Sequence, residues 1–498
     1  MEAEKSTKSN IKKNYFYNMM AKLIMLLVPI LVTPYLSRKL GADGNGRLSY
    51  IASIVSYFVL LANIGIETYG QRIIAVHQND KGYLKKITLE IGILRILLTI
   101  FSLALYYVIF VIIYQKNQVL YALYGITLLM TAFDFSWFFQ GIEDFKILAL
   151  SNMISRITYI PLIFIMVHDQ SDINIAAILT ILSTAVPYVL CLPKMLSFFK
   201  GVKMPSKLHP FDHFKPCMVY FIPTIAIQIY TVLDKTMIGL ITKSDFENGY
   251  YEQAEKIVKL PLTVITSLNI VMRSRISYYY SMGRIGDIKL LMNKSCHFTM
   301  CMSIPICLGL CAVASNFIPI YLGEGYEKCI TLLYVFSPII IIISLSNFLG
   351  THYYTPFDLQ KTSNRFLIIG ALINLVLNSF LIYFLKSIGA AIASVVAEGV
   401  ITCLYIYFSR KIFEPINFIK IGYKYIISGL FMFAAVFIFN TLWLYSDFSK
   451  FKAISYLVLE IGIGIIIYFG LLYILKDSFV FDSTKKVLNK LKRRYGLK

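Results

Sequence analysis

Fourteen predominantly apolar stretches follow one another along this 498-residue chain. An α-helix needs about 20 such residues to cross the hydrocarbon core of a bilayer, and each stretch reaches that length. Hydrocarbon offers the backbone no hydrogen-bond partner, so stretches of this kind cross a membrane as helices. The predicted spans are 14–38, 48–71, 87–114, 118–140, 145–168, 173–199, 217–241, 250–272, 295–322, 328–354, 362–385, 388–409, 419–445 and 453–475. The sequence therefore predicts an all-α integral membrane protein with about 14 transmembrane helices.

The composition agrees with a chain that is solvated by lipid. Hydrophobic residues make up 57% of the sequence and charged residues 15%, and a soluble protein would have to leave much of that apolar surface exposed. With about 25 residues in each span, roughly 10 residues remain for each connection. Such connections cannot bury a core of their own, which argues against a large soluble catalytic domain.

Positive charge is concentrated on one side of the predicted membrane. The formal net charge is +21, from 48 Lys and Arg against 27 Asp and Glu. With the N-terminus inside, and with cations in the terminal six residues of a span counted with the adjoining loop, the inner tails and loops hold 33 of the 48 cations, the outer loops hold 9 and the span interiors hold 6. Cytoplasmic loops are enriched in Lys and Arg, so we expect a multi-pass protein with both termini cytoplasmic. We assign the charge to topology and not to nucleic-acid binding.

A long interruption of the hydrophobic pattern is 201–216, which contains three prolines and is basic at both ends. It separates six spans from the eight that follow. A comparison at an offset of 203 residues aligns Gly46 with Gly249, Ile54 with Ile257 and Val55 with Val258. Because this offset covers six spans, both units would insert the same way up, as in two-lobed carriers that are built from parallel repeats.

These features predict two six-helix lobes plus two C-terminal helices, with a cleft between the lobes near the midplane. The predicted domains are an N-terminal lobe (1–200), a cytoplasmic linker (201–216), a C-terminal lobe (217–410), spans 13 and 14 (411–476) and a basic cytoplasmic tail (477–498). In the tail, Val487, Leu488 and Leu491 fall on one side of a basic helix. We expect this helix to lie at the anionic inner leaflet.

Six cations lie in the interior of the predicted spans, outside the terminal six residues at either end, where a charged side chain costs roughly 2.5–3.5 kcal/mol on insertion scales. They are Lys22, Arg95, Arg156, Lys235, Lys256 and Lys259. We predict that they face an internal path and bind an anionic substrate, since successive cations can replace the water around an anionic head group. The alternative is that carboxylates neutralise them, or that their side chains extend to the span ends.

Five carboxylates are candidates for ion coupling or for pairing with these cations. They are Asp134, Asp234, Glu252, Glu255 and Glu398. Glu255 reaches Lys259 at i,i+4, whereas Glu398 has no cation at i±3 or i±4 and is a candidate for coupling to a proton or a sodium ion. We predict no metal site, because the eight cysteines form no CxxC pair and His209 and His213 lack a third ligand. No other cofactor is expected.

The first eight spans carry several short motifs. They are PYLSR at 34–38 followed by Leu40-Gly41, Tyr57-Phe58, LDK at 233–235, GYY at 249–251 and AEK at 254–256. Together they resemble the polysaccharide transporter family, whose members flip lipid-linked O-antigen and capsule repeat units and belong to the multidrug/oligosaccharidyl-lipid/polysaccharide flippase superfamily. The resemblance implies a central cationic cavity, alternating access and an undecaprenyl-diphosphate-linked oligosaccharide as substrate. It also implies the cytoplasmic membrane of a bacterium, with membrane lipids and other polysaccharide-assembly membrane proteins as partners.

Two other functions stay open on the sequence. A membrane-embedded polysaccharide polymerase or glycosyltransferase would carry a sizeable outer loop with catalytic residues, and every predicted outer loop is short. A cation-coupled drug or small-molecule exporter of the same superfamily would favour carboxylates over cations along its path. The sequence also contains no Walker A motif for ATP. We therefore predict a transporter and not an enzyme, with no catalytic residues.

Overall fold

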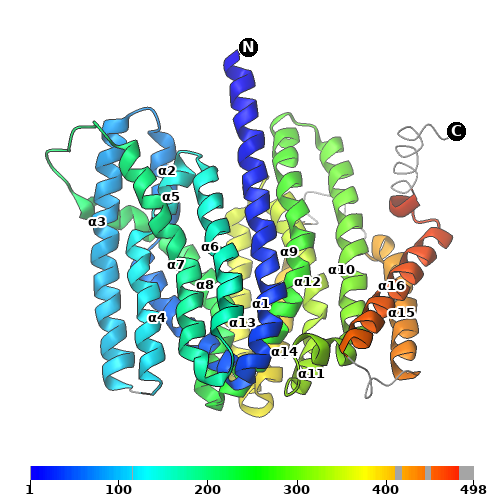
Figure 1. Cartoon of the computed structure of the whole chain (residues 1–498). Helices are drawn as coiled ribbons and strands as arrows, with labels where there is room; N and C mark the ends of the chain where they lie inside the picture. Colours follow the sequence, from blue (N-terminus) through cyan, green and yellow to red (C-terminus); the bar gives the residue numbers. More distant parts are fainter. Residues whose placement is uncertain (1, 115, 410–417, 443–449, 482–498) are drawn as a thin grey trace. The chain divides into compact units, whose positions relative to one another are not determined.

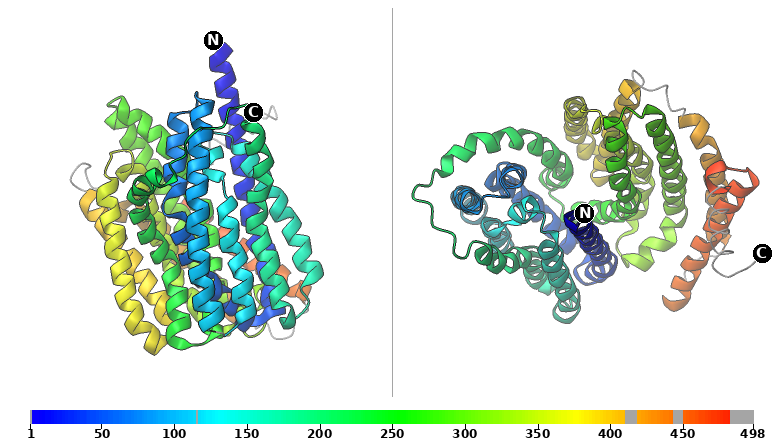
Figure 2. Two further views of the ribbon diagram at one scale, coloured as in Figure 1. Left: turned by 90° about the vertical axis from the view of Figure 1, so that its left-hand side faces the viewer. Right: turned by 90° about the horizontal axis from the view of Figure 1, so that it is seen from above.

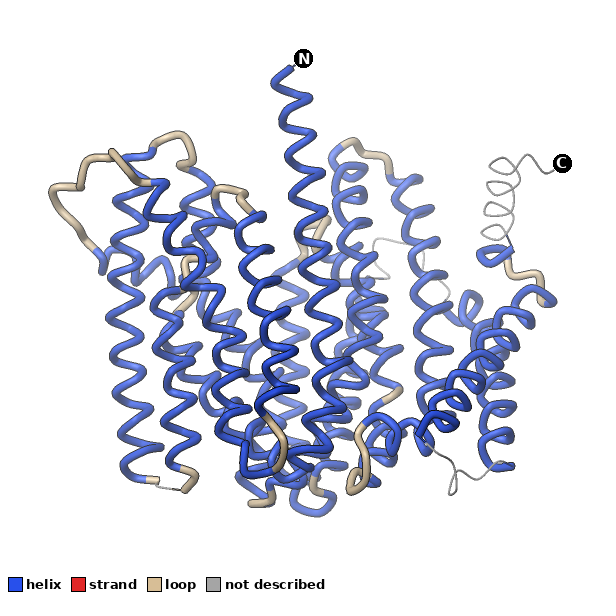
Figure 3. Tube along the Cα trace, in the orientation of Figure 1, coloured by secondary structure: helices blue, strands red, loops and turns tan. Residues whose placement is uncertain are grey.

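The protein is helical throughout most of the residues that its computed structural model describes, which are 2–114, 116–409, 418–442 and 450–481 (Figure 3). No strand is present in these ranges. Eleven segments of the described residues are long and apolar enough to cross a bilayer. These observations confirm the predicted all-α fold and indicate a multi-pass membrane protein.

The helices follow the predicted spans closely. α1 (Glu2–Asn63) contains the first span and most of the second, and α8 (Phe214–Thr242) and α9 (Asp245–Ser281) match the seventh and eighth. The other helices are α2 (Ile66–Val76), α3 (Lys81–Tyr106), α4 (Gln118–Met130), α5 (Ser136–Gly141), α6 (Phe145–Met166), α7 (Ile173–Phe198), α10 (Ile285–Tyr321), α11 (Glu327–Phe336), α12 (Pro338–Leu349), α13 (Gln360–Leu385), α14 (Ser387–Ser409), α15 (Phe418–Leu442) and α16 (Lys450–Ile474). Short 3-10 or π-helical turns are η1 (Tyr107–Ile113), η2 (Thr131–Phe133), η3 (Gln170–Asp172), η4 (Pro210–His213) and η5 (Gly350–Tyr354). Part of the predicted tail, 482–498, lies outside the described residues.

The chain divides into two compact units, Met1–Gly249 (unit 1) and Tyr250–Lys498 (unit 2). α8 therefore packs in unit 1, although the sequence places it at the start of the second lobe. Within unit 1 the long helices run side by side in both views of Figure 2. The N-terminal end of α1 and the segment 199–213 lie at the same end of this unit (Figure 1), as six intervening spans require.

α1 breaks at Gly41, whose φ of 66° lies in the left-handed region that favours glycine. Asn45 is buried beside the break, and its amide donates to the carbonyl oxygens of Leu36 (3.1 Å) and Gly41 (2.8 Å). These bonds satisfy carbonyl groups near the break in the regular helical ladder. The first and second predicted spans are thus joined by a sharp break and not by an extended loop.

The part of α1 that follows this break contacts the α8–α9 junction backbone to backbone. A Cβ atom on Gly46 would overlap the carbonyl oxygen of Asp245, and a Cβ atom on Gly249 would overlap that of Ala42. The offset of 203 residues relates Ala42 to Asp245 and Gly46 to Gly249. The two contacts are therefore equivalent under the offset, and the weak repeat in the sequence corresponds to a reciprocal pair of contacts in the structure.

Polar side chains extend the contact between α1 and α8. The hydroxyl groups of Tyr57 and Thr236 are 3.2 Å apart, and Thr236 donates to the hydroxyl of Ser53 at 3.0 Å. At the junction itself, Nε of Arg47 lies 3.3 Å from a carboxylate oxygen of Asp245. These bonds, together with the glycine contacts, explain why α8 packs in unit 1.

Unit 2 is held together by buried polar contacts between its helices. Asn374 of α13 donates to Ser394 of α14 (3.4 Å), and Tyr251 of α9 hydrogen-bonds to the same hydroxyl (3.3 Å). α10 packs against α15 and α16, and Asn440 of α15 donates to the carbonyl oxygen of Ala312 (3.1 Å). The helices of the last two predicted spans are therefore part of the packing of unit 2.

The glycine contact predicts a steric penalty at Gly46. We expect Gly46→Ala to destabilise the protein by about 1–3 kcal/mol, the usual range for overpacking, because the new Cβ atom meets backbone that cannot move aside easily. Gly286→Ala is the matched control, since it gains the same helix propensity in a helix with no atom within 4 Å of the new carbon. The apparent melting temperature in detergent measures both. An equal or higher melting temperature for Gly46→Ala than for the control would contradict the contact.

Candidate functional site

The second predicted span is broken inside unit 1. α1 ends and α2 begins on either side of Ile64 and Gly65, whose φ values are 35° and 75°. A Cβ atom on Gly65 would lie 2.5 Å from the carbonyl oxygen of Cys217 on α8, so glycine is required there. The predicted span 48–71 is therefore not one continuous helix but two helices joined at Ile64 and Gly65. Broken helices in membrane transporters mark places where backbone groups can line a binding site.

The fourth predicted span, 118–140, is broken as well. α4 passes into the short turn η2, and Asp134 follows with an extended backbone (φ −81°, ψ 99°) before α5 begins. The Oδ1 atom of Asp134 accepts a hydrogen bond from the backbone N–H of Ser136 at 2.9 Å. α5 packs closely on α2, since a Cβ atom on Gly70 would lie 2.5 Å from the ring of Trp137. The packed helices α2 and α5 thus each begin at a break.

Arg95 of α3 joins the two breaks, and only 2% of its side chain is exposed. Its terminal nitrogens donate to the backbone carbonyl oxygen of Asp134 at 2.8 Å and to Oδ2 of the same residue at 3.1 Å. Glu67, in the first turn of α2, lies 4.0 Å from the same guanidinium. A buried charge needs such partners, because lipid and protein interior cannot solvate it. The guanidinium of Arg95 is thus bound to Asp134, and its predicted contact with substrate stays a prediction.

Glu67 is the accessible member of this group, with 54% of its side chain exposed. Asn63, one turn earlier in the chain, donates to Oε1 of Glu67 at 2.8 Å, and the dipole of α2 favours an acidic residue at this position. Two carboxylates and one guanidinium give the group a formal charge of −1. Its accessible end can therefore attract a proton or a cation. The sequence reasoning missed Glu67, although a carboxylate inside a predicted span is the signal that could have found it.

Arg156 and Tyr188 extend the polar group to α6 and α7. Arg156 is partly exposed and donates to the hydroxyl of Ser183 on α7 at 3.0 Å. Tyr188 of α7 interacts electrostatically with Arg156 and also with Arg95 and Asp134. The structure therefore brings two of the six predicted cations, Arg95 and Arg156, within electrostatic range of one tyrosine.

The other predicted residues of unit 1 lie on α1 and α8. The side chain of Lys22 is outside the described residues. On α8, Asp234 is buried and interacts electrostatically with Tyr57 of α1, whereas Lys235 is partly buried. The structure thus brings Asp234 to the contact between α1 and α8, and the substrate roles of Lys22 and Lys235 stay predictions.

In unit 2, Lys256 and Lys259 of α9 pair with carboxylates of the same helix. The ammonium of Lys256 lies 2.9 Å from Glu252, and that of Lys259 lies 2.5 Å from Glu255. The i,i+4 contact expected for Glu255 and Lys259 is therefore present. In this pair the lysine side chain is 53% exposed and the carboxylate side chain 12%, so the ammonium group is the one that a ligand can reach.

Two further carboxylates lie within predicted spans of unit 2. Glu398 of α14 is partly buried and interacts electrostatically with Tyr405 on the same helix. Glu460 of α16 is fully buried, and its Oε1 atom accepts a hydrogen bond from Asn316 of α10 at 2.8 Å. Its Oε2 atom has no hydrogen-bond partner among the described residues. The sequence reasoning missed Glu460, although it is the only carboxylate within the predicted span 453–475.

The chain is similar to known proteins along most of its length. The family model described as a polysaccharide biosynthesis protein matches residues 11–273, more than half of the chain. A protein of Escherichia coli (strain K12) named as an O-antigen transporter is 26% identical over 413 residues, which cover 82% of this chain and 98% of that protein. A protein of Haloferax volcanii named as a low-salt glycan biosynthesis flippase is 23% identical over 299 residues, which cover 58% of this chain and 61% of that protein.

A solved structure with a similar fold is that of the lipid II flippase MurJ in an inward closed conformation. The TM-score is 0.70 and the sequence identity 18%, and the match covers 94% of this chain and 99% of that one. At this identity the likeness concerns the fold alone. It confirms the fold class that the hydrophobic stretches predict.

The buried ion pair predicts an asymmetric response to substitution. We expect Arg95→Gln to destabilise the protein by about 3–5 kcal/mol, because Asp134 is left as an uncompensated buried charge. Replacing both residues with leucine should recover much of this loss, since no charge remains. Arg284→Gln is the control, because its exposed pair with Asp287 (2.6 Å) should contribute less than about 1 kcal/mol. Thermal unfolding in detergent measures all three, and a double variant no more stable than Arg95→Gln would contradict the role of the pair.

Proposed function

This chain belongs to the polysaccharide biosynthesis protein family, and from this membership we propose that it is a flippase for a lipid-linked oligosaccharide. It is a membrane transporter and not an enzyme, like the relatives named for O-antigen transport and glycan flipping. Its substrate joins a lipid, which stays in hydrocarbon, to a polar head that cannot cross hydrocarbon without replacing its water. The protein has to supply polar groups for that head inside the membrane.

The observation that carries the proposal is the polar group at the two helix breaks of unit 1. Ionisable residues inside membrane spans are energetically costly, and they face the interior of a helix bundle or a water-filled cavity. Here the buried Arg95–Asp134 pair lies beside Glu67, whose side chain is about half exposed. An accessible carboxylate inside a span needs water or a polar ligand beside it. This supports a polar path through the membrane and argues against a purely structural scaffold.

We propose undecaprenyl diphosphate as the lipid carrier, with movement from the inner to the outer leaflet of a bacterial cytoplasmic membrane by alternating access. The motifs of the first eight spans support the carrier and the membrane. The excess of Lys and Arg in alternate loops supports an orientation with both termini cytoplasmic. Other polysaccharide-assembly membrane proteins would supply the lipid-linked unit and use it after transfer.

For the diphosphate we propose contacts with predicted cations whose side chains are not fully buried where they are described. These are Arg156, Lys235, Lys256 and Lys259, together with Lys22, whose side chain is outside the described residues. Ammonium and guanidinium groups form charge-assisted hydrogen bonds to phosphate oxygens. Arg95 is proposed as a buried support for this set. For coupling to a proton or a sodium ion we propose Glu398 and, from their position in the structure, Glu67 and Glu460.

Transfer in proteoliposomes tests the function. With a labelled lipid-linked oligosaccharide in one leaflet, the purified chain should move the label to the other leaflet faster than protein-free liposomes do. We expect Glu67→Gln to slow transfer by about tenfold, or about 1.4 kcal/mol, while the melting temperature stays near that of the wild type. Glu324→Gln, an exposed loop carboxylate, is the matched control. Transfer by the wild type at the protein-free rate would refute the proposed function.

Variants of Lys259 and Glu255 distinguish a role of Lys259 in substrate binding from a role in structural pairing. If the ammonium contacts the diphosphate, Lys259→Ala should slow export by about tenfold at unchanged abundance. If Lys259 only neutralises Glu255, the single change should lower abundance, and the double change Glu255→Gln, Lys259→Gln should restore both abundance and export. Surface polysaccharide and protein level are measured together, and normal export by the double variant would remove Lys259 from the proposed site.

Alternating access predicts that the contact between Arg47 and Asp245 opens during transport. In a background without the native cysteines, a short thiol crosslinker between Arg47→Cys and Asp245→Cys should stop export at normal abundance. The control joins Asp144→Cys to Lys194→Cys, which replaces an ion pair of 2.5 Å between the start of α6 and the end of α7. That crosslink should leave export unchanged. Full export with complete crosslinking at positions 47 and 245 would exclude opening at this contact.

A further inference from the structure

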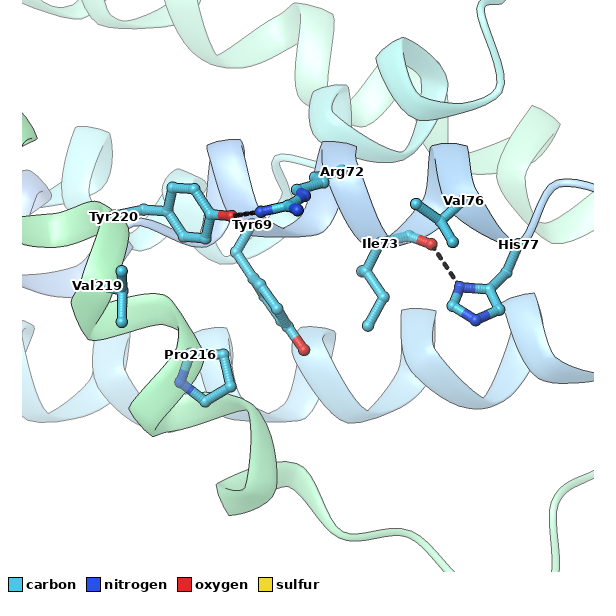
Figure 4. Close-up of a pocket in the computed structure, with 8 residues that line it drawn as sticks. All are labelled: Tyr69, Arg72, Ile73, Val76, His77, Pro216, Val219 and Tyr220. Atoms are coloured by element: carbon cyan, nitrogen blue, oxygen red, sulfur yellow. Dashed lines mark hydrogen bonds between the residues drawn. The ribbon is translucent and has the colours of Figure 1, made fainter. Parts of the chain in front are cut away.

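A cavity of about 360 Å³ lies between α2 and α8 in unit 1 (Figure 4). Its walls come from the last two turns of α2 and the first two turns of α8. Neither the proposed path for the oligosaccharide nor the group around Arg95 uses it. The volume is at the lower end of the range for small-molecule sites, which is small for an oligosaccharide head.

One rim of the cavity is cationic. Arg72 extends along α2 toward α8, and its guanidinium donates a hydrogen bond to the hydroxyl of Tyr220 (Figure 4). A guanidinium has five N–H donors, and this is the single hydrogen bond that the described residues provide to it. No Asp or Glu lines the cavity. The rim therefore offers unneutralised positive charge with a hydroxyl beside it, which is the chemistry that binds a phosphate.

The rest of the cavity is lined mainly by apolar side chains, with the ring of His77 beside them, and is open at the surface of unit 1. Val76 is 70% exposed and Val219 is 67% exposed, and the side chain of Ile73 lies between Val76 and Tyr69 (Figure 4). Val76 is the last residue of an apolar segment long enough to span the bilayer. An apolar wall at the end of a span, with an arginine at its rim, matches an amphiphile that carries both a chain and a charged head.

Hydrogen bonds fix the two walls relative to each other. The hydroxyl of Tyr69 on α2 lies 2.8 Å from Nδ1 of His213, the residue before α8. The other ring nitrogen of His213 lies 3.0 Å from Glu90 of α3, and the same carboxylate accepts the backbone N–H of His209 at 2.8 Å. These bonds hold the start of α8 against α2 and α3 without a ligand. A cavity that is formed in advance loses less entropy when it binds.

We propose that this cavity binds one anionic glycerophospholipid of the bilayer. The phosphate lies on Arg72 and Tyr220, and an acyl chain runs along Val76 and Val219. A single guanidinium matches the single charge of a phosphodiester. The bound lipid bridges α2 and α8 and so stabilises the packing of α8 in unit 1.

Native mass spectrometry of the purified full chain tests the binding. Phosphatidylglycerol and phosphatidylcholine of the same acyl composition are titrated separately. We expect one phosphatidylglycerol to be retained about tenfold more tightly than phosphatidylcholine. Arg72→Gln should bring the two lipids to about equal retention, and Tyr220→Phe should give a smaller loss. Arg365→Gln, which removes an exposed arginine of α13 that is not part of the cavity, should keep the wild-type preference.

Two further arms distinguish a lipid from a free phosphate. In the first, Val219→Trp should fill the space along the apolar wall and weaken retention of both lipids. In the second, phosphatidylglycerol should raise the melting temperature of the wild type, and inorganic phosphate and glycerol phosphate should not. If Arg72→Gln does not fold, Arg72→Lys should keep most of the preference, because charge remains. An unchanged preference in Arg72→Gln, unchanged lipid retention in Val219→Trp, or equal stabilisation by inorganic phosphate would overturn the proposal.

Discussion

The organisation of unit 1 depends on the ion pair between Arg95 and Asp134. A guanidinium buried among membrane helices cannot take its hydrogen bonds from lipid, so a carboxylate and a carbonyl group have to reach it. Asp134 provides both, because α4 ends before it and leaves its backbone extended. α5 then starts beside α2, and the contact of Gly70 with Trp137 brings the break before α2 to the same place. The polar site and the helix breaks are therefore two aspects of one constraint.

Hydropathy predicted where the helices lie and did not predict where they break. The average over a span is dominated by its apolar residues, so the two left-handed residues before α2 and the extended Asp134 leave the apolar signal intact. At the break, Gly65 lies against the carbonyl oxygen of Cys217 with no room for a side chain, a contact across more than 150 residues of sequence. The same kind of contact places α8 in unit 1. No local pattern contains that information.

The candidate site was likewise predictable from the sequence only where its contacts are local. The pair of Lys259 and Glu255 was predictable because four residues separate them on one helix. Arg95 and Asp134 were both recognised as costly charges, but they are 39 residues apart and their pairing is tertiary. Glu67 and Glu460 were not among the five carboxylates selected from the sequence, although both lie within predicted spans. A carboxylate within a span has a cost similar to that of a cation, so applying this criterion to every acidic residue of the spans would have included both.

Two ion pairs of unit 1, Arg95–Asp134 and Arg47–Asp245, differ in strength in a way that suits a carrier. The Arg95–Asp134 pair is almost wholly buried, so breaking it would leave charge in a low-dielectric environment. The Arg47–Asp245 pair is between a fifth and a third exposed, and pairs with access to water contribute about 1 kcal/mol or less. Beside it, Gly46 and Gly249 present backbone to backbone with no side chain to interlock. The first contact therefore fixes the helices around the site, whereas the second can separate at low cost, as the proposed alternating access requires.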